Sequence, residues 1–119
     1  MENFKSYRDL IVWQRALDLT EIVYQDTARF PKEEAYGLTS QVRRAVVSVA
    51  ANIAEGHARN TTGEFKQFLG IARGSLAEVE TLILLSKRLG FLSDESAESI
   101  LKLCDDVSRM LSGLKKSLK

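Results

Sequence analysis

The side chains best suited to catalysis are few in this sequence, and they do not cluster. His57 is the only histidine and Cys104 the only cysteine among 119 residues. A di-metal bundle site takes a Glu-x-x-His pair from each of two helices, which one histidine cannot supply within one chain. Glu55 and His57 are two residues apart, so on a helix they point to different faces and form no ready acid–base pair. We therefore expect a surface histidine, no metal, no cofactor and no enzymatic activity.

The single cysteine and the interior glycines also argue against catalysis. Cys104 falls on an apolar stripe with no basic neighbour, where a thiol behaves as a small hydrophobic group and is inert. One cysteine allows no disulfide within the chain, which agrees with a reducing compartment. Gly70 and Gly74 are not followed by the Lys-Ser or Lys-Thr of a phosphate-binding loop, so nucleotide hydrolysis is unsupported.

Basic residues in the middle of the chain are the candidates for ligand binding. The whole chain has a net charge of +1, whereas residues 41–77 hold five basic and two acidic residues. The candidate nucleic-acid contacts are Arg43, Arg44, Arg59, Lys66 and Arg73. Successive residues on a helix differ by about 100°, so Arg43 and Arg44 must diverge. An oligomer could gather such charges into a ring that binds phosphates, and the alternative is a solvated face with scattered charges.

A second group of residues is a candidate for helix packing or subunit contact. Gly70 and Gly74 each cost a helix about 1 kcal/mol relative to alanine, which a close helix approach would offset. The approaching helix could come from the same bundle or from a neighbouring subunit. Polar residues interrupt otherwise apolar neighbourhoods at Asn52, Glu55, Glu78 and Glu80. If paired inside or between subunits they would fix the helix register, and the alternative is ordinary surface ion pairs.

Four apolar stripes with helical spacing predict the elements that must position these residues. The helices are expected at about 8–29, 36–57 and 61–90, and from 93 to near the carboxyl end. Ser6, Ser93 and a Thr61–Glu64 capping box favour helix starts, whereas Phe30-Pro31 and Gly90 favour helix ends. Short turns force antiparallel neighbours. The predicted fold is all-α, a single domain over residues 1–119 that forms an antiparallel up-down-up-down four-helix bundle.

Targeting and membrane segments are not indicated by the sequence. No apolar stretch approaches the roughly 20 residues of a membrane-spanning helix. The segment from Met1 to Arg8 has no apolar signal core and no small-residue cleavage pattern. We expect a cytoplasmic protein with no membrane partner.

Several short stretches resemble one known family. They are Asp9-Leu10-Ile11-Val12-Trp13-Gln14, Phe30-Pro31, Tyr36-Gly37-Leu38, Gln41-Val42-Arg43-Arg44-Ala45, Asn52-Ile53-Ala54-Glu55-Gly56 and Ala72-Arg73-Gly74-Ser75-Leu76-Ala77-Glu78-Val79-Glu80-Thr81. Together they resemble the four helix bundle protein family, also called 23S rRNA-intervening-sequence proteins, over residues 9 to about 92. In the last helix only the heptad pattern agrees.

The resemblance implies a fold and an assembly but no catalytic residues. Members look like four-helix bundles in homopentameric rings, and some are encoded within insertions in large-subunit ribosomal RNA genes. The related accessory variability proteins of diversity-generating retroelements use a basic pentamer surface to bind nucleic acid and reverse transcriptase. The leading hypothesis is therefore a non-enzymatic homo-oligomeric adaptor, a pentamer by resemblance, that binds RNA or DNA. The alternative is a structural scaffold that holds a partner protein without binding nucleic acid.

Overall fold

Four long helices account for most of the chain. The computed structural model describes residues 6–119, in which α1 (Ile11–Thr27), α2 (Leu38–His57), α3 (Thr62–Arg88) and α4 (Asp94–Ser117) are α-helices. Two short 3₁₀ helices, η1 (Tyr7–Asp9) and η2 (Lys32–Glu34), precede α1 and α2, and this part of the chain contains no strand. Residues 1–5 lie outside the described residues. They include the first residues of the predicted domain and of the segment that was expected to lack a targeting signal.

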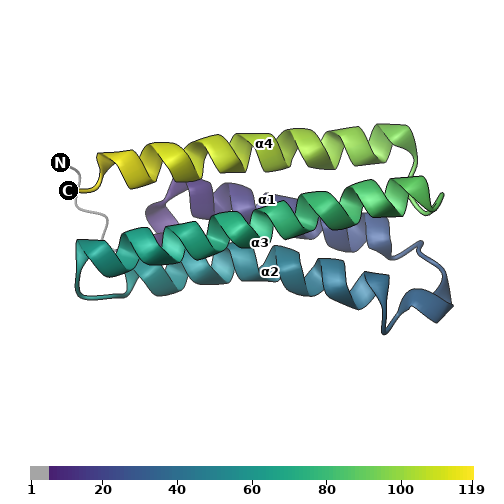
Figure 1. Ribbon diagram of the computed structural model, residues 1–119, viewed down its shortest axis with the longest axis horizontal. Coiled ribbons are helices and arrows are strands. Elements are labelled where there is room, and N and C mark those ends of the chain that lie inside the picture. Colours follow the sequence, from purple (N-terminus) through teal and green to yellow (C-terminus); the bar gives the residue numbers. More distant parts are fainter. Residues whose placement is uncertain (1–5) are drawn as a thin grey trace.

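The helices form the predicted antiparallel bundle. Each packs along the next in the chain, and α4 returns to pack against α1, so that the four close into an up-down-up-down arrangement (Figure 1). The molecule measures 46 × 24 × 19 Å, with the helices along its longest dimension. The packing between α2 and α3 is the most extensive. The α2–α3 turn and the carboxyl end of the chain lie at the same end of the bundle.

The helix starts follow the capping residues read from the sequence, with two differences. The amide of Ser96 donates to Ser93 Oγ at 3.0 Å, and the amide of Glu64 donates to Thr61 Oγ1 at 3.1 Å. The Glu64 carboxylate accepts from the Thr61 hydroxyl at 3.0 Å, so only half of the expected capping box forms. Ser6 caps η1, and α1 itself begins at Ile11 because Leu10 is extended.

The carboxyl end of α3 has the geometry that its glycine predicts. Gly90 has a φ of +81°, and its amide donates to the Lys87 carbonyl at 3.0 Å. The amide of Phe91 donates to the Ser86 carbonyl at 2.9 Å, which completes a Schellman motif. This turn places the Phe91 ring 5.7 Å from the ring of Phe30, and the pair covers this end of the core.

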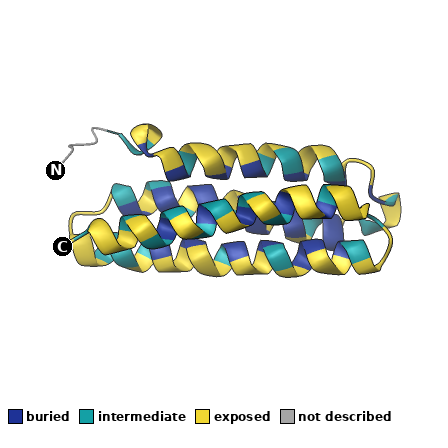
Figure 2. Ribbon diagram, turned by 90° about the horizontal axis from the view of Figure 1, so that it is seen from above, coloured by how far each residue is buried: buried dark blue, intermediate teal, exposed yellow. Residues whose placement is uncertain are grey.

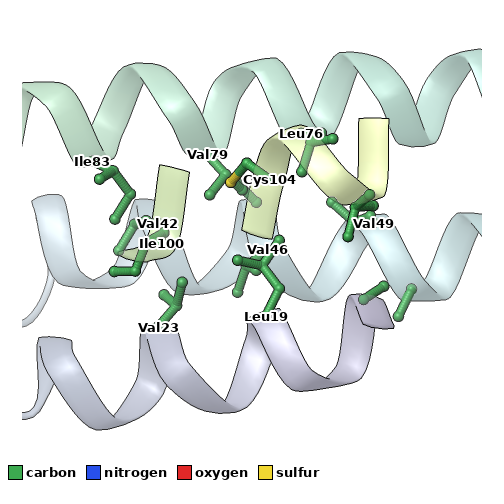
Figure 3. Packing of buried hydrophobic residues seen from close by; sticks show 14 of the residues in the cluster. Leu19, Val23, Val42, Val46, Val49, Leu76, Val79, Ile83, Ile100 and Cys104 are labelled. Carbon is green, nitrogen blue, oxygen red and sulfur yellow. The ribbon is translucent and has the colours of Figure 1, made fainter. Parts of the chain in front are cut away.

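The apolar stripes of all four helices meet on the bundle axis and form one continuous core. Figure 2 shows buried residues along the inward faces of the helices and exposed residues along the outward faces. In Figure 3, Leu19 and Val23 of α1 lie opposite residues of the other helices. The other labelled core residues are Val42, Val46 and Val49 of α2, Leu76, Val79 and Ile83 of α3, and Ile100 and Cys104 of α4. Every buried side-chain nitrogen or oxygen in residues 6–119 has a hydrogen-bond partner.

The close helix contact within the bundle is at Gly56, not at Gly70 or Gly74. A Cβ atom on Gly56 would lie 2.6 Å from Cβ of Phe68 and 3.0 Å from Cδ1 of Phe65, so α2 approaches α3 closely only because this position has no side chain. Gly74 has no atom of the described chain within 4 Å of that point, and Gly70 has only Nζ of Lys115, at 3.9 Å. Within residues 6–119 of one subunit, therefore, no helix packs closely against Gly70 or Gly74. A contact with a neighbouring subunit stays a prediction.

Candidate nucleic-acid interface

The five cations proposed as nucleic-acid contacts do not share one face. Arg43 turns toward α1, where its Nε donates to Oγ1 of Thr27 at 2.9 Å and its guanidinium lies 4.5 Å from the centre of the Tyr24 ring. A second nitrogen donates to the Tyr24 carbonyl at 3.2 Å. Arg43 is half-buried and occupied by these contacts, so it ties α2 to α1.

Arg44 and Arg59 lie on the opposite side of α2, next to α3. Arg59 donates to Glu55 at 2.8 Å and covers the Phe68 ring at 4.7 Å, so its charge is already paired. Arg44 lines a shallow groove of about 390 Å³ together with Tyr36, Ser40, Gln41, Ala45, Ser48 and Glu78. Because the groove contains both a cation and a carboxylate, it offers little attraction to a polyanion.

Lys66 and Arg73 are brought together on the side of α3 that faces α4. Nη1 of Arg73 donates to Oγ of Ser112 on α4 at 2.7 Å. Lys66 is seven residues earlier, two helical turns away on the same side. Between them lies Gly70, and Nζ of Lys115 on α4 is 3.9 Å from the point a Cβ there would occupy. The open space at Gly70 thus lets a lysine of α4 reach the surface of α3.

The end of α4 contributes cations that were not among the sequence candidates. Lys115 and Lys116 lie in the last turn of α4 and Lys119 follows it, where cations are favoured by the negative end of the helix dipole. Arg73 contacts Ser112 and Gly70 lies next to Lys115, so the end of α4 runs beside the first half of α3, and these lysines lie at the same end of the bundle as Lys66 and Arg73 (Figure 1). We call this set the basic strip: Lys66, Arg73, Lys115, Lys116 and Lys119.

The basic strip is not neutralised by acidic side chains. None of its five members forms an ion pair within residues 6–119, although Arg15, Arg29, Arg59, Lys87 and Arg109 all do. Arg73, Lys115, Lys116 and Lys119 are exposed, and Lys66 is half-buried. Unpaired exposed cations side by side produce a positive local potential that attracts phosphates.

The bundle carries opposite charges at its two ends. Contacts of Thr20 with Val46, Ser48 with Ser75, and Arg73 with Ser112 mark the level at which the bundle is divided here, midway along α1, α2 and α3 and near the end of α4. The half that contains the α2–α3 turn (residues 6–18, 48–74 and 111–119) has eight basic and four acidic residues, a net charge of +4. The other half (residues 19–47 and 75–110) has eight basic and eleven acidic residues, a net charge of −3. The net charge of +1 for the whole chain therefore does not reveal that one half of the bundle is basic and the other acidic.

Comparisons with known proteins agree with the fold and decide the family. A family model described as 23S rRNA-intervening sequence protein matches residues 8–113. The chain belongs to this family. A crystal structure of a protein of unknown function from the S23 ribosomal protein family of Bacteroides thetaiotaomicron has the same fold, with a TM-score of 0.81 and 23% sequence identity over 90% of this chain and 100% of that chain. No curated protein matches the sequence significantly.

In this family member, the polar residues predicted to set helix register lie at the surface or between two helices. Asn52 is half-buried, and its Nδ2 donates to the Ser48 carbonyl at 2.8 Å and hydroxyl at 2.9 Å. Ser48 in turn accepts from Ser75 of α3 at 3.0 Å, so Asn52 belongs to a small polar contact between α2 and α3. Glu55 and Glu78 are exposed, and Glu80 is half-buried on the side of α3 near Cys104.

Residues suited to catalysis do not assemble in this family member either. No group of three His, Cys, Asp or Glu side chains in the described part of the chain is placed to hold a metal ion. The ring of His57 packs edge-on against Phe65 at 5.8 Å.

None of the described helices is both long and apolar enough to cross a membrane.

Cys104 is fully buried, as its place on the apolar stripe of α4 predicted. Burial, with a smaller contribution from the Glu80 carboxylate, raises the pKa of the thiol from 9.0 to about 12. The group is therefore neutral at pH 7, and its sulfur is covered on all sides.

The raised pKa gives the fold a dependence on alkaline pH. Below pH 9 the thiol is protonated in both the folded and unfolded chain and contributes no pH dependence; above it, only the unfolded chain loses the proton. Stability should therefore fall by roughly 1 kcal/mol per pH unit between pH 9 and 12. Urea unfolding at a series of pH values measures the free energy of unfolding. The same series for Cys104→Ala is subtracted from that of the wild type, so that the contribution of lysines and tyrosines cancels. Parallel pH profiles for the two proteins would contradict the expectation.

Proposed function

We propose that this protein is a non-enzymatic, cytoplasmic homo-oligomeric adaptor that binds RNA. The observation that carries the proposal is the basic strip, in which α3 and the carboxyl end of the chain contribute, at one end of the bundle, five cations that form no ion pair within residues 6–119. The family description, 23S rRNA-intervening sequence protein, supports ribosomal RNA as the first ligand to test.

Assembly with copies of the same chain would strengthen the binding of RNA to the basic strip, which is small in one subunit. Each subunit offers only a few phosphate contacts, and a ring presents several such patches to one ligand, which raises the avidity without any new contact. Exposed apolar side chains on α3 and at its carboxyl cap support the proposal, since Ile71, Leu84 and Leu89 are each about half exposed in the isolated subunit. The uncovered glycines Gly70 and Gly74 lie on the same helix. The resemblance noted above favours a pentamer.

The experiment is a solution-mass measurement on purified, nuclease-treated protein. Light scattering gives the number of subunits, and a second series adds a short ribosomal RNA fragment at low and moderate salt. A defined oligomer that gains RNA mass at low salt and releases it as salt rises supports the proposal, because counterion release makes phosphate binding salt-dependent. A particle whose mass does not change when RNA is added at low salt contradicts the proposal.

A protein scaffold without nucleic-acid binding is the second candidate. It is favoured by the fully exposed ring of Tyr36, which lies beside the groove lined by Arg44 and Glu78. Exposed aromatic residues next to mixed charges are common at protein interfaces. An oligomer that ignores RNA, and whose binding to an isolated partner protein is lost in a Tyr36→Ala variant, would favour this candidate over the first.

A further inference from the structure

We infer that the basic strip binds the sugar–phosphate backbone of one nucleic-acid strand and reads neither its bases nor its sugar. The inference rests on the proposed function and adds to it the chemical group that is recognised. Three features support it: the kinds of side-chain donor in the basic strip, the aromatic rings near it, and the change from basic to acidic residues along the bundle.

The donors of the strip suit phosphates and not base edges. Four of its members are lysines, whose ammonium groups on long flexible stems act as point charges without directional selectivity. The one guanidinium, that of Arg73, is partly held by its hydrogen bond to Ser112. Base discrimination needs bidentate contacts from well-placed Arg, Asn or Gln side chains in a groove. The strip instead lies on the surfaces of two antiparallel helices and offers charge alone.

The two aromatic rings of α3 at the same end of the bundle are occupied. Phe65 is half-buried and meets the His57 ring edge-on, and Phe68 is half-buried beneath the Arg59 guanidinium. Proteins that hold unpaired bases generally stack them on exposed aromatic faces. Because these two rings already contact protein groups, base stacking would require the local packing to open.

The length of the strip and the charge around it limit the contact to a few phosphates. Lys66 and Arg73 are seven residues apart, about 10 Å along the helix axis. Lys115 reaches the surface between them at Gly70. Further along α3 and α4 the bundle becomes acidic, since Glu80, Asp105 and Asp106 belong to the half with a net charge of −3. A strand is therefore attracted to one end of the subunit and repelled from the other.

The test compares two triple variants of equal charge. The strip variant is Lys66→Gln, Arg73→Gln and Lys115→Gln; the control is Lys32→Gln, Arg88→Gln and Lys102→Gln, which removes three cations that form no ion pair in the described chain and lie in the acidic half. Circular dichroism and light scattering check that both variants keep their fold and mass. Binding is followed by fluorescence anisotropy over a salt series, with labelled single strands of about 12 nucleotides.

The wild type should bind oligo-U, oligo-A and mixed sequences, as RNA or as DNA, with affinities within about threefold of one another. Each lost phosphate contact lowers the slope of log K against log salt by roughly 0.7 for a single strand, so the strip variant should lose about 2 in slope and the control much less. Equal losses in both variants, or a strong preference for one sequence or sugar, would overturn this inference while leaving RNA binding intact. Failure of the wild type to bind any strand at low salt would overturn the proposed function itself.

Discussion

Replacing Gly56 by valine is expected to lower the free energy of unfolding by about 3 kcal/mol or more, because overpacking a closely packed contact forces the backbones apart. A Cβ at this position would lie 2.6 Å from Cβ of Phe68, an atom fixed to the α3 backbone that cannot rotate away. The α2–α3 packing is the most extensive in the bundle, so separating these helices affects the whole core. Urea unfolding followed by circular dichroism measures the change.

A matched control for Gly56 is available on α3. Gly74 is also an interior helical glycine, but an added Cβ meets no atom of the described chain within 4 Å. Gly74→Ala should therefore stabilise an isolated subunit by up to about 1 kcal/mol through helix propensity. A loss of stability or a smaller particle mass in Gly74→Ala would instead indicate a close subunit contact there. Equal stability of Gly56→Val and wild type would contradict the close approach of α2 and α3.

Leu76→Ala is expected to be the second most damaging change, at about 2–5 kcal/mol. The side chain is 1% exposed and points into the core from α3, among residues of the other helices (Figure 3). Its removal loses the apolar transfer energy and leaves a cavity that the four packed helices cannot fully close. The shift in the urea midpoint at an unchanged m-value reports the loss.

Leu84→Ala makes the same chemical change on the same helix at a position that is 47% exposed. For an isolated subunit the effect should be well under 1 kcal/mol, as is usual at the surface. If subunits cover Leu84 in an assembly, the loss will instead be larger and will depend on protein concentration. Similar losses for Leu76→Ala and Leu84→Ala in a protein shown to be monomeric would contradict the assignment of Leu76 to the core.

The fold could be predicted from the sequence because its signals are local. Apolar residues such as Leu76, Val79 and Ile83 repeat at the spacing of one helix face, and each of these residues is buried. Ser93 and Gly90 also mark a helix start and a helix end without reference to any other element. The boundary of α1 was less accurate, since η1 and the extended Leu10 interrupt the expected helix.

The site could be predicted only in part because it depends on which helices are neighbours and how each is rotated. Lys66 and Arg73 were two of the five candidates and lie on the same side of α3, whereas Arg43, another candidate, binds Thr27 and Tyr24 on α1. Lys115 is more than 40 positions from Lys66 in sequence, so nothing in local spacing joins them. Nothing in the local sequence marks Gly56 as a close contact, and only the position of Phe68 on α3 explains why a glycine is needed there.

The order in which the helices contact one another also bears on how the chain reaches its native state. All but one of the contacts between the four long helices join helices that are consecutive in the chain; the α1–α4 contact, with a smaller one between η1 and α2, connects distant segments. The entropy of loop closure is small for consecutive helices joined by short turns, and a topology of low contact order folds rapidly. The α2–α3 hairpin, which has the shortest turn and the most extensive packing, is the natural folding nucleus, and α1 and α4 can then dock on a surface that already exists.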